Sequence, residues 1–373
     1  MNFSINKTAF SSTASIVSHA ISSTSPQPSL RGMKITAKDN TLILTGSDAD
    51  ISIEKTITAN DSNNLVISEE GSILIEAKYL LDIVKKLDSE IITIEVLDGA
   101  LTRFSGNSAV FKINGMNVID YPTIDFSRPA DSISIQSSIL SEIIEETTFA
   151  TAIKETRPVL TGVHFSLKDH VLTCTATDSY RLAKKTLPFN VDASFDITIP
   201  AKSLNEIRST MILDQDQMIV MAMSDKKAQF YSDDMLLQTR LLDGGYPDTD
   251  RLIPDAFDYK LTINRMDLIH AIDRTTFIKS DNMNVNRLQC SANEVILTSK
   301  SQEIGESRES LTATFEGEDL DISFSGSYVL EAARAFKSDT IMIQFKGDMR
   351  PFILTDPQDE TILQLVLPVR TYN

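Results

Sequence analysis

Residues 3–21 read FSINKTAFSSTASIVSHAI, a short alternating strand followed by the apolar spacing of an amphipathic helix. The pattern returns at residues 132–150, SISIQSSILSEIIEETTFA, and at residues 260–278, KLTINRMDLIHAIDRTTFI. Equivalent isoleucines, such as Ile5 and Ile135, lie 130 residues apart at the first step and 128 at the second. The chain therefore contains three copies of one unit. A threefold repeat also occurs in adhesins, but this repeat is far too long for a solenoid.

A second strand-to-helix unit recurs inside each copy. It reads ILIEAKYLLDIVKKL at residues 73–87, ITIPAKSLNEIRSTM at residues 197–211 and ISFSGSYVLEAARAF at residues 322–336. Apolar residues form one stripe on each of these helices, which predicts that the stripe faces the core. The stripe residues are Leu80, Val84 and Leu87, then Leu204, Ile207 and Met211, then Leu330, Ala333 and Phe336.

Alternating stretches rich in Thr, Ile, Leu and Val separate the two helices of each copy, as half-buried strands do. The sequence therefore predicts an α+β protein of three tandem similar domains, each with two helices on antiparallel sheets. We place the domains at residues 1–125, 126–254 and 255–373, with boundaries near the related strings DYPTID and GYPDTD. No Gly/Ser-rich linker separates them, so we expect them to pack rigidly end to end.

The six predicted helices span residues 7–21, 77–87, 137–150, 201–211, 264–278 and 327–337. They contain ten basic and eight acidic residues, while the whole chain has a net charge of −17. The acidic residues thus lie mostly outside the helices. If the six helices line one surface, that surface is weakly positive and attracts phosphates without reading sequence. The alternative is that these are ordinary solvated helix faces.

Motifs of catalysis are absent from the sequence. None of the four histidines has a Cys or carboxylate partner at metal-ligand spacing, so neither a metal nor a cofactor is expected. The sequence has no GxxxxGK[ST], GxGxxG or GxSxG string. The two cysteines, Cys174 and Cys290, lie in strand-like runs and are expected to be buried thiols. The first residues lack a signal-peptide pattern and no apolar run is membrane-spanning, which predicts a cytoplasmic protein.

Four strings, together with the triple repeat, carry a family resemblance that covers the whole chain. They are TRPVLTGVHF at residues 156–165, TDSYRLA at 177–183, LLDGGYPDTDRLIP at 241–254 and LVLPVR at 365–370. In combination they closely resemble the bacterial DNA polymerase III β subunit, the β sliding clamp. The resemblance implies a head-to-tail homodimeric ring around duplex DNA, with helices lining the hole and no catalytic activity. It also implies docking of the replicative polymerase, the clamp loader and other proteins that carry the clamp-binding motif.

The resemblance further implies a pocket between the second and third domains that binds a short partner peptide with apolar and Gln anchors. Ser179 and Tyr180 stand where the family often has Gly-His, and Met283 stands where an aromatic can occur. The matching positions are Leu160, Thr177, Ser179, Tyr180, Arg181, Leu182, Pro247, Arg251, Leu252, Met283, Ser325, Tyr328, Met349, Leu365, Val366, Leu367, Pro368, Val369 and Arg370. From the residues alone, Leu182 and Leu367 are equally compatible with core, and Arg181 with an ordinary ion pair.

Two further sets follow from the helix pattern and the resemblance together. The residues expected to face DNA are Lys78, Lys85, Lys86, Lys154, Arg157, Lys202, Arg208, Arg274, Arg334 and Lys337. The residues expected at the ring interface are Phe111, Ile113, Phe277 and Ile278. The four interface positions are also compatible with core residues.

Two other functional classes stay open on the sequence. A three-domain interaction scaffold would bind partner proteins without DNA. An enzyme using the groove near Asp178 would need a strongly perturbed titrating pair there, and the sequence supplies none visibly.

Overall fold

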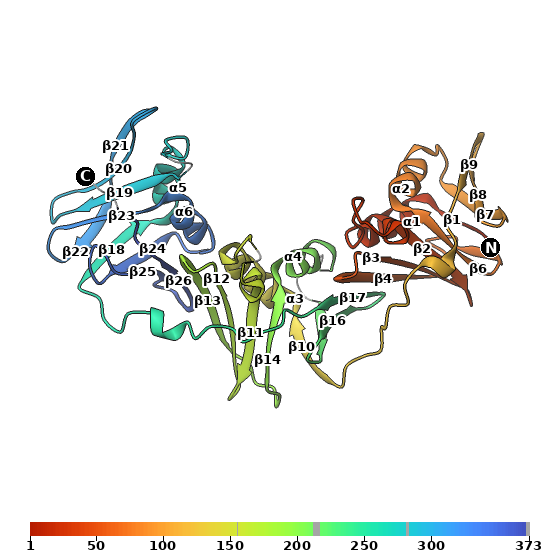
Figure 1. Ribbon diagram of the computed structural model, residues 1–373, viewed down its shortest axis with the longest axis horizontal. Coiled ribbons are helices and arrows are strands. Elements are labelled where there is room, and N and C mark those ends of the chain that lie inside the picture. The colour runs from red at the N-terminus through yellow and green to blue at the C-terminus, as the bar shows by residue number, and fades with distance from the viewer. Residues whose placement is uncertain (155, 212–216, 281–282, 371–373) are drawn as a thin grey trace. The chain divides into compact units, whose positions relative to one another are not determined.

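The structure is a computed structural model that describes residues 1–154, 156–211, 217–280 and 283–370 (Figure 1). Each of the six predicted helices is present within these residues. Their bounds are α1 (Lys7–Ser18), α2 (Ala77–Lys86), α3 (Ser137–Thr147), α4 (Ala201–Thr210), α5 (Arg265–Asp273) and α6 (Gly326–Arg334). Short 3-10 helices are η1 (Pro28–Arg31), η2 (Val118–Asp120), η3 (Thr148–Ala150), η4 (Pro158–Thr161) and η5 (Asp250–Leu252).

The predicted helices are too long at their C-termini. Each begins within one residue of its predicted start, but α1 ends at Ser18 instead of residue 21, and α5 ends at Asp273 instead of residue 278. The apolar pattern continues past the last helical turn because the following turns also bury residues. Ala150, for example, is buried in a 3-10 turn after α3. Burial periodicity thus marks the buried face but not the hydrogen-bonded end of a helix.

Two of the four sheets, all with antiparallel strand pairing, contain the first repeat and part of the second. The five-stranded sheet has the order β5 (Val66–Glu69), β1 (Asn2–Asn6), β7 (Ile91–Asp98), β8 (Leu101–Gly106) and β9 (Ala109–Asn114). The eight-stranded sheet has the order β10 (Asp131–Gln136), β15 (Met218–Met223), β16 (Lys227–Ser232), β17 (Met235–Arg240), β4 (Ile51–Thr58), β3 (Thr41–Ser47), β2 (Gly32–Lys38) and β6 (Gly71–Glu76).

The other two sheets contain the rest of the second repeat and the third. The nine-stranded sheet has the order β14 (Phe195–Pro200), β11 (Gly162–Lys168), β12 (Val171–Thr177), β13 (Arg181–Pro188), β26 (Asp359–Val366), β25 (Phe352–Asp356), β24 (Thr340–Phe345), β18 (Tyr259–Asn264) and β22 (Ala313–Glu316). The four-stranded sheet has the order β21 (Gly305–Leu311), β20 (Val295–Ser301), β19 (Val285–Cys290) and β23 (Leu320–Ser325).

The threefold repeat is confirmed by the element order. In each copy a first strand, β1, β10 or β18, leads into α1, α3 or α5. A later strand, β6, β14 or β23, leads into α2, α4 or α6. The apolar helix stripes are buried as predicted, because every one of their nine residues has under 9% of its surface exposed. Both cysteines are buried and free.

Sheet continuity divides the chain into two compact units and cuts the middle repeat. Unit 1 comprises Met1–Ile139 and Asn205–Leu241, and unit 2 comprises Leu140–Leu204 and Leu242–Asn373. In unit 1, β17 of the middle repeat pairs with β4 of the first. In unit 2, β13 of the middle repeat pairs with β26 of the third. Each junction is thus a shared sheet, which leaves no open strand edge there.

Helices pack pairwise within the units. In unit 1, α1 lies against α2, and in unit 2, α5 lies against α6 (Figure 1). Lys7 at the start of α1 donates to the carbonyls of Leu87 at 2.5 Å and of Lys85 at 3.3 Å. In the described ranges, no helix is both long and apolar enough to cross a membrane.

Candidate functional site

A tight turn between β12 and β13 begins the candidate pocket in unit 2. The carboxylate of Asp178 accepts hydrogen bonds from the backbone N–H groups of Tyr180 at 2.9 Å and Arg181 at 3.0 Å. The Thr177 hydroxyl donates to the Arg181 carbonyl at 2.6 Å and accepts from the Ser179 N–H at 3.1 Å. Ser179 lies at φ +77°, a left-handed conformation that favours glycine. The turn therefore holds Tyr180 outward, with 62% of its surface exposed.

Arg181 is buried directly behind this turn and is fully occupied by contacts within the protein. Its guanidinium pairs with Asp178 at 3.0 Å and with Glu331 of α6, and it donates to the Phe149 carbonyl at 2.5 Å. Its charge also lies 4.6 Å from the ring centre of Tyr328. Arg181 thus joins α6 to β13 and supports the Tyr328 ring from behind. Burial is the main cause that raises the pKa of Tyr328, so its hydroxyl stays protonated.

The chain after β26 forms the opposite side of the pocket. The Leu367 N–H donates to the Tyr180 carbonyl at 2.9 Å, and the Val369 N–H donates to the Ser323 carbonyl at 2.7 Å. Pro368 forms an isolated bridge with Phe324. These bonds fix residues 367–369 between the turn at Tyr180 and strand β23.

The turn, the final segment and α6 enclose a cavity of about 820 Å³. Its size and its mixture of apolar and aromatic side chains with a few polar groups are typical of a ligand or peptide site. It is lined by Tyr180, Thr276, Lys279, Met283, Asn284, Ser325, Ser327, Tyr328, Leu367, Pro368 and Val369.

The cavity brings together seven residues of the predicted peptide set. They are Tyr180, Met283, Ser325, Tyr328, Leu367, Pro368 and Val369. The prediction missed four lining residues, Thr276, Lys279, Asn284 and Ser327. Each of the four is the immediate sequence neighbour of a residue in the predicted peptide or interface sets. That adjacency was the available signal, but it does not say which neighbour faces the cavity.

Most of the remaining residues of the predicted peptide set lie in the interior or at a second hollow. Leu182 and Leu365 are buried with Ile353, and Leu367 and Ile253 pack against that cluster. Leu160, Thr177 and Val366 are also buried, and Pro247 is half-buried. A hollow of about 570 Å³ is lined by Arg251, Leu252, Ile253, Pro254, Asp255, Ala256, Lys346, Arg350 and Pro351. Met349 and Arg370 are exposed and line neither cavity.

The basic residues expected to face DNA are all exposed, but their charges are only partly free. Arg274 pairs with Glu309, Arg334 with Asp273 at 3.6 Å, and Lys337 with Glu142 at 2.6 Å. By contrast, the side-chain ammonium groups of Lys78, Lys85 and Lys86 on α2 make no hydrogen bond or ion pair within the described residues. Lys154 and Arg157 lie before η4, and Lys202 and Arg208 lie on α4.

The expected excess of basic residues on the helices needs a correction. Arg274 and Lys337 lie just beyond the ends of α5 and α6. The helices as folded therefore contain eight basic and eight acidic residues, a balance of zero against the −17 of the whole chain. The acidic excess still lies entirely outside the helices. Any attraction of the helices for phosphate is accordingly weak.

The four residues expected at the ring interface have different surroundings. Phe111 and Ile113 are half-buried on β9, which is an edge strand of its sheet. Phe277 is exposed over 66% of its surface, whereas Ile278 is exposed over only 3%. Ile278 thus contributes to the core of its own unit in the single chain.

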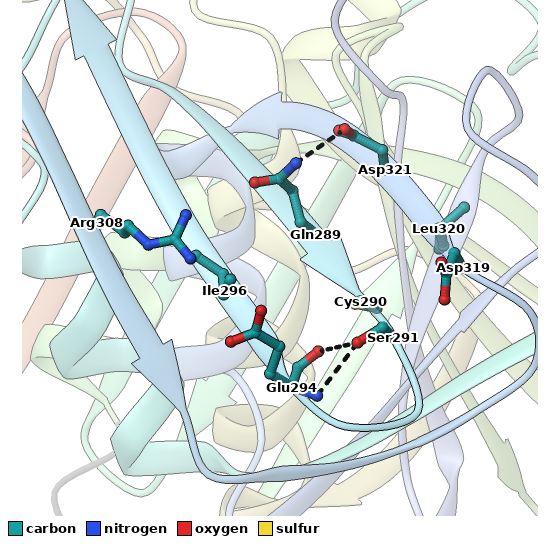
Figure 2. Close-up of a pocket in the computed structure, with 9 residues that line it drawn as sticks. All are labelled: Gln289, Cys290, Ser291, Glu294, Ile296, Arg308, Asp319, Leu320 and Asp321. Atoms are coloured by element: carbon teal, nitrogen blue, oxygen red, sulfur yellow. Dashed lines mark hydrogen bonds between the residues drawn. The ribbon is translucent and has the colours of Figure 1, made fainter.

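Figure 2 shows a polar hollow of about 390 Å³ on the four-stranded sheet of unit 2, away from every predicted site residue. Gln289 donates to Asp321 at 3.2 Å, and Ser291 exchanges hydrogen bonds with the Glu294 backbone at 3.2 Å. Cys290 lies at its base, where burial raises the pKa of the thiol to about 12. A thiol that remains protonated at neutral pH is a poor nucleophile, so this hollow offers no cysteine chemistry.

Three repeats that share antiparallel sheets define a clamp-type fold, and unit 2 contains a cavity of peptide size. Three family models, each for one domain of the DNA polymerase III beta subunit, match the chain along its length. The N-terminal domain model matches residues 1–125, the central domain model residues 134–248 and the C-terminal domain model residues 250–370.

Full-length relatives agree with these matches. The beta sliding clamp of Bacillus subtilis is 38% identical, and that of Staphylococcus aureus strain Mu50 is 36% identical, each over 100% of both chains. Crystal structures of the sliding clamp from Bacillus subtilis (TM-score 0.94) and of the beta subunit from Streptococcus pyogenes (TM-score 0.93, 32% identity) also align over 100% of both chains. The chain belongs to the DNA polymerase III beta subunit family, the bacterial sliding clamps. Members of this family are processivity subunits of the polymerase and have no catalytic role.

Proposed function

We propose that two copies of this chain form a head-to-tail ring that encircles duplex DNA and slides along it. The ring tethers the replicative DNA polymerase and accepts the clamp loader and other proteins with a clamp-binding motif. Its three domains span residues 1–125, 126–254 and 255–373, and it acts in the cytoplasm. The closed ring holds the DNA by topology, so it does not need tight contacts with phosphate. Helices with equal numbers of basic and acidic residues attract phosphate only weakly, and weak attraction favours sliding.

The observation that carries the docking role is the cavity between Tyr180 and Leu367. Tyr180 and Met283 are exposed and Tyr328 is half-buried, and together they offer aromatic and flexible apolar surface. Ser325 and Ser327 offer hydroxyl groups that can orient an amide side chain. An apolar peptide segment with one Gln anchor fits this chemistry.

Fluorescence anisotropy with a labelled Gln-Leu-x-Leu-Phe-type peptide tests the docking role. The intact chain is expected to bind, and a variant that ends at Leu367 is expected to lose binding because it lacks Pro368 and Val369. The Arg308→Gln variant, altered in the hollow of Figure 2, is the matched control and should bind normally. Absence of binding to the intact chain would remove the peptide site.

Retention on DNA tests the ring. After loader-dependent loading, the chain is expected to stay on closed circular DNA through gel filtration and to leave when the circle is linearised. Release on linearisation distinguishes a topological link from ordinary binding. A chain that binds the peptide but is never retained on circles would be an interaction scaffold.

A further inference from the structure

Lys279 introduces a positive charge into the cavity proposed to dock partner peptides. Among the described residues that line the cavity, it is the one charged side chain, and none is acidic. Its neighbours there include Met283, Leu367, Pro368 and Val369, which are apolar. Its ammonium makes no hydrogen bond or ion pair within the part of the chain that the structure describes. Within the described residues, the cavity therefore offers a cation without an acidic partner beside apolar surface.

The backbone around Lys279 is held firmly on both sides. Asn284, which is buried in the cavity wall, donates from its side chain to the carbonyls of Thr275 at 2.7 Å and Ile278 at 2.9 Å. Ser280 and Met283 exchange two backbone hydrogen bonds of 2.9 Å each. The position of Lys279 at the cavity is thus set by the fold and does not depend on a bound peptide.

We propose that Lys279 determines specificity by pairing with a carboxylate of the docked peptide, an inference that rests on the docking role proposed above. The carboxylate comes either from an acidic residue beside the apolar anchors or from the free C-terminus of a partner whose motif ends its chain. Both supply the same chemistry, a planar anion that accepts hydrogen bonds from an ammonium.

The preference for a carboxylate has to come from the local contact with Lys279, because the net negative charge of the whole protein opposes it. At a net charge of −17, the protein repels acidic peptides at long range, although salt screens that repulsion beyond about 8 Å at physiological ionic strength. A short contact beside apolar side chains is screened less than an exposed pair. A surface ion pair changes affinity by less than about fivefold, and a pair at a partly enclosed site by more. An effect of about three- to tenfold is expected here.

The test is a double-mutant cycle on the full-length protein with labelled peptides that share the Gln-Leu-x-Leu-Phe-type core. One pair of peptides ends in a free carboxylate or in an amide. Two further pairs, all amidated, carry Asp or Asn after the core, or Glu or Gln before it. These arms separate a terminal carboxylate from an acidic side chain on either flank. Each peptide is measured against the unaltered protein and the Lys279→Gln, Lys279→Arg and Lys300→Gln variants. Lys300 is exposed in the same domain and does not line the cavity, so it controls for net charge.

The unaltered protein is expected to bind at least one carboxylate peptide about three- to tenfold more tightly than its neutral counterpart. That preference should vanish in Lys279→Gln while binding of the neutral peptide persists, and it should survive in Lys279→Arg and Lys300→Gln. This inference is overturned if the peptides bind the unaltered protein without a preference for a carboxylate. It is also overturned if the preference persists in Lys279→Gln, and either result leaves the proposed docking site intact. Failure of every peptide to bind the unaltered protein overturns both.

Discussion

Gly326, the first residue of α6, stands where the other two repeats have Ala77 and Ala201. A Cβ atom at this position would overlap Oδ1 of Asn284 and Nδ2 of Asn286. These two buried amides form part of a hydrogen-bond network with Thr275 that supports the cavity wall. The glycine thus provides room for the two asparagine amides, and its backbone angle plays no part.

Gly326→Ala is expected to lower the free energy of unfolding by about 1–3 kcal/mol, because the added methyl must displace a satisfied buried network. Urea denaturation followed by circular dichroism measures the change. Gly245→Ala is the matched control, since a Cβ there meets nothing within 4 Å. Equal urea midpoints for the two variants would show that the hydrogen-bond network accommodates the methyl group without loss of stability.

A buried ion pair lies within the second repeat in unit 2, and a carboxylate of the third repeat approaches it. Lys185 of β13 and Glu146 of α3 are 2% and 3% exposed, and their charged atoms are 2.8 Å apart. Asp359 of β26 lies 3.3 Å from the same ammonium. Burial is the main cause that raises the pKa of Glu146, and Lys185 opposes that rise. The carboxylate therefore depends on its partner to remain charged.

Lys185→Met is expected to cost about 3–5 kcal/mol near neutral pH, because it leaves a buried carboxylate unpaired. The pKa of Glu146 then rises further above its unfolded value, so the protonated form is favoured in the folded state. The stabilisation that comes from protonating Glu146 in the folded state is present at low pH, and it is lost as the pH rises through the pKa of Glu146 in the folded protein. The deficit should consequently shrink at pH ~5 relative to pH ~8 in urea titrations.

Lys184→Met provides the comparison for that experiment. Lys184 pairs with Asp250, whose side chain is exposed, at 2.7 Å, and such a pair contributes about 0–1 kcal/mol. Its loss should be small at both pH values. A Lys185→Met deficit that is equally small, or that does not depend on pH, contradicts the assigned role of the buried pair.

At the scale of elements, Lys7 links two helices of unit 1. It begins α1, yet its ammonium caps the C-terminal carbonyls at the end of α2. A cation at a helix C-terminus offsets the negative end of the helix dipole and satisfies carbonyls that have no helical partner. This lysine, which a charge count assigns to a phosphate-attracting face, is instead used inside the fold.

Lys7→Met is expected to lower the free energy of unfolding by about 0.5–2 kcal/mol and to leave retention on closed circular DNA unchanged. Lys78→Met on the exposed side of α2 is the control, with no loss of stability, because no bond of its ammonium is found in the described residues. Chemical denaturation and DNA retention are measured on the same preparations. A Lys7→Met protein with unchanged stability that dissociates faster from closed circular DNA would contradict the structural role of Lys7 and indicate a DNA contact instead.

At the scale of the whole molecule, we expect the proposed ring to close through strand edges and apolar side chains that one chain leaves uncovered. Strand β9 is an open edge, and Phe277 is a large exposed aromatic. An uncovered edge and an exposed apolar side chain together favour association with another chain. Ile278 is a poorer probe of this contact, because Ile278→Glu places a charge in the core and destabilises the domain as well.

Phe277→Glu is expected to convert a dimer into a monomer with an unchanged unfolding midpoint. Light scattering coupled to gel filtration should report half the solution mass of the unaltered protein. Ile119→Glu changes a different exposed apolar side chain, in the connection after β9, and should remain dimeric. A Phe277→Glu protein that keeps the dimer mass would exclude this residue from the ring contact.

The sequence alone determined the threefold repeat, the helix starts and the buried stripes, because each follows from apolar periodicity over a few neighbouring residues. The family resemblance added seven residues that line the cavity, from Tyr180 to Val369. Thr276, Lys279, Asn284 and Ser327 were not predicted, since no local pattern says which of two adjacent residues faces a cavity formed by distant segments.

Only the tertiary structure decided the rest. Arg181 meets Glu331 across 150 positions of sequence, and Lys185 meets Asp359 across 174. Such pairs depend on which strands share a sheet, and β13 pairs with β26 although one belongs to the second repeat and the other to the third. The same pairing divides the middle repeat between two units, which three similar sequence copies give no reason to expect. Burial of a side chain in a distant contact is a property of the assembled sheets, so it could not be obtained from local periodicity.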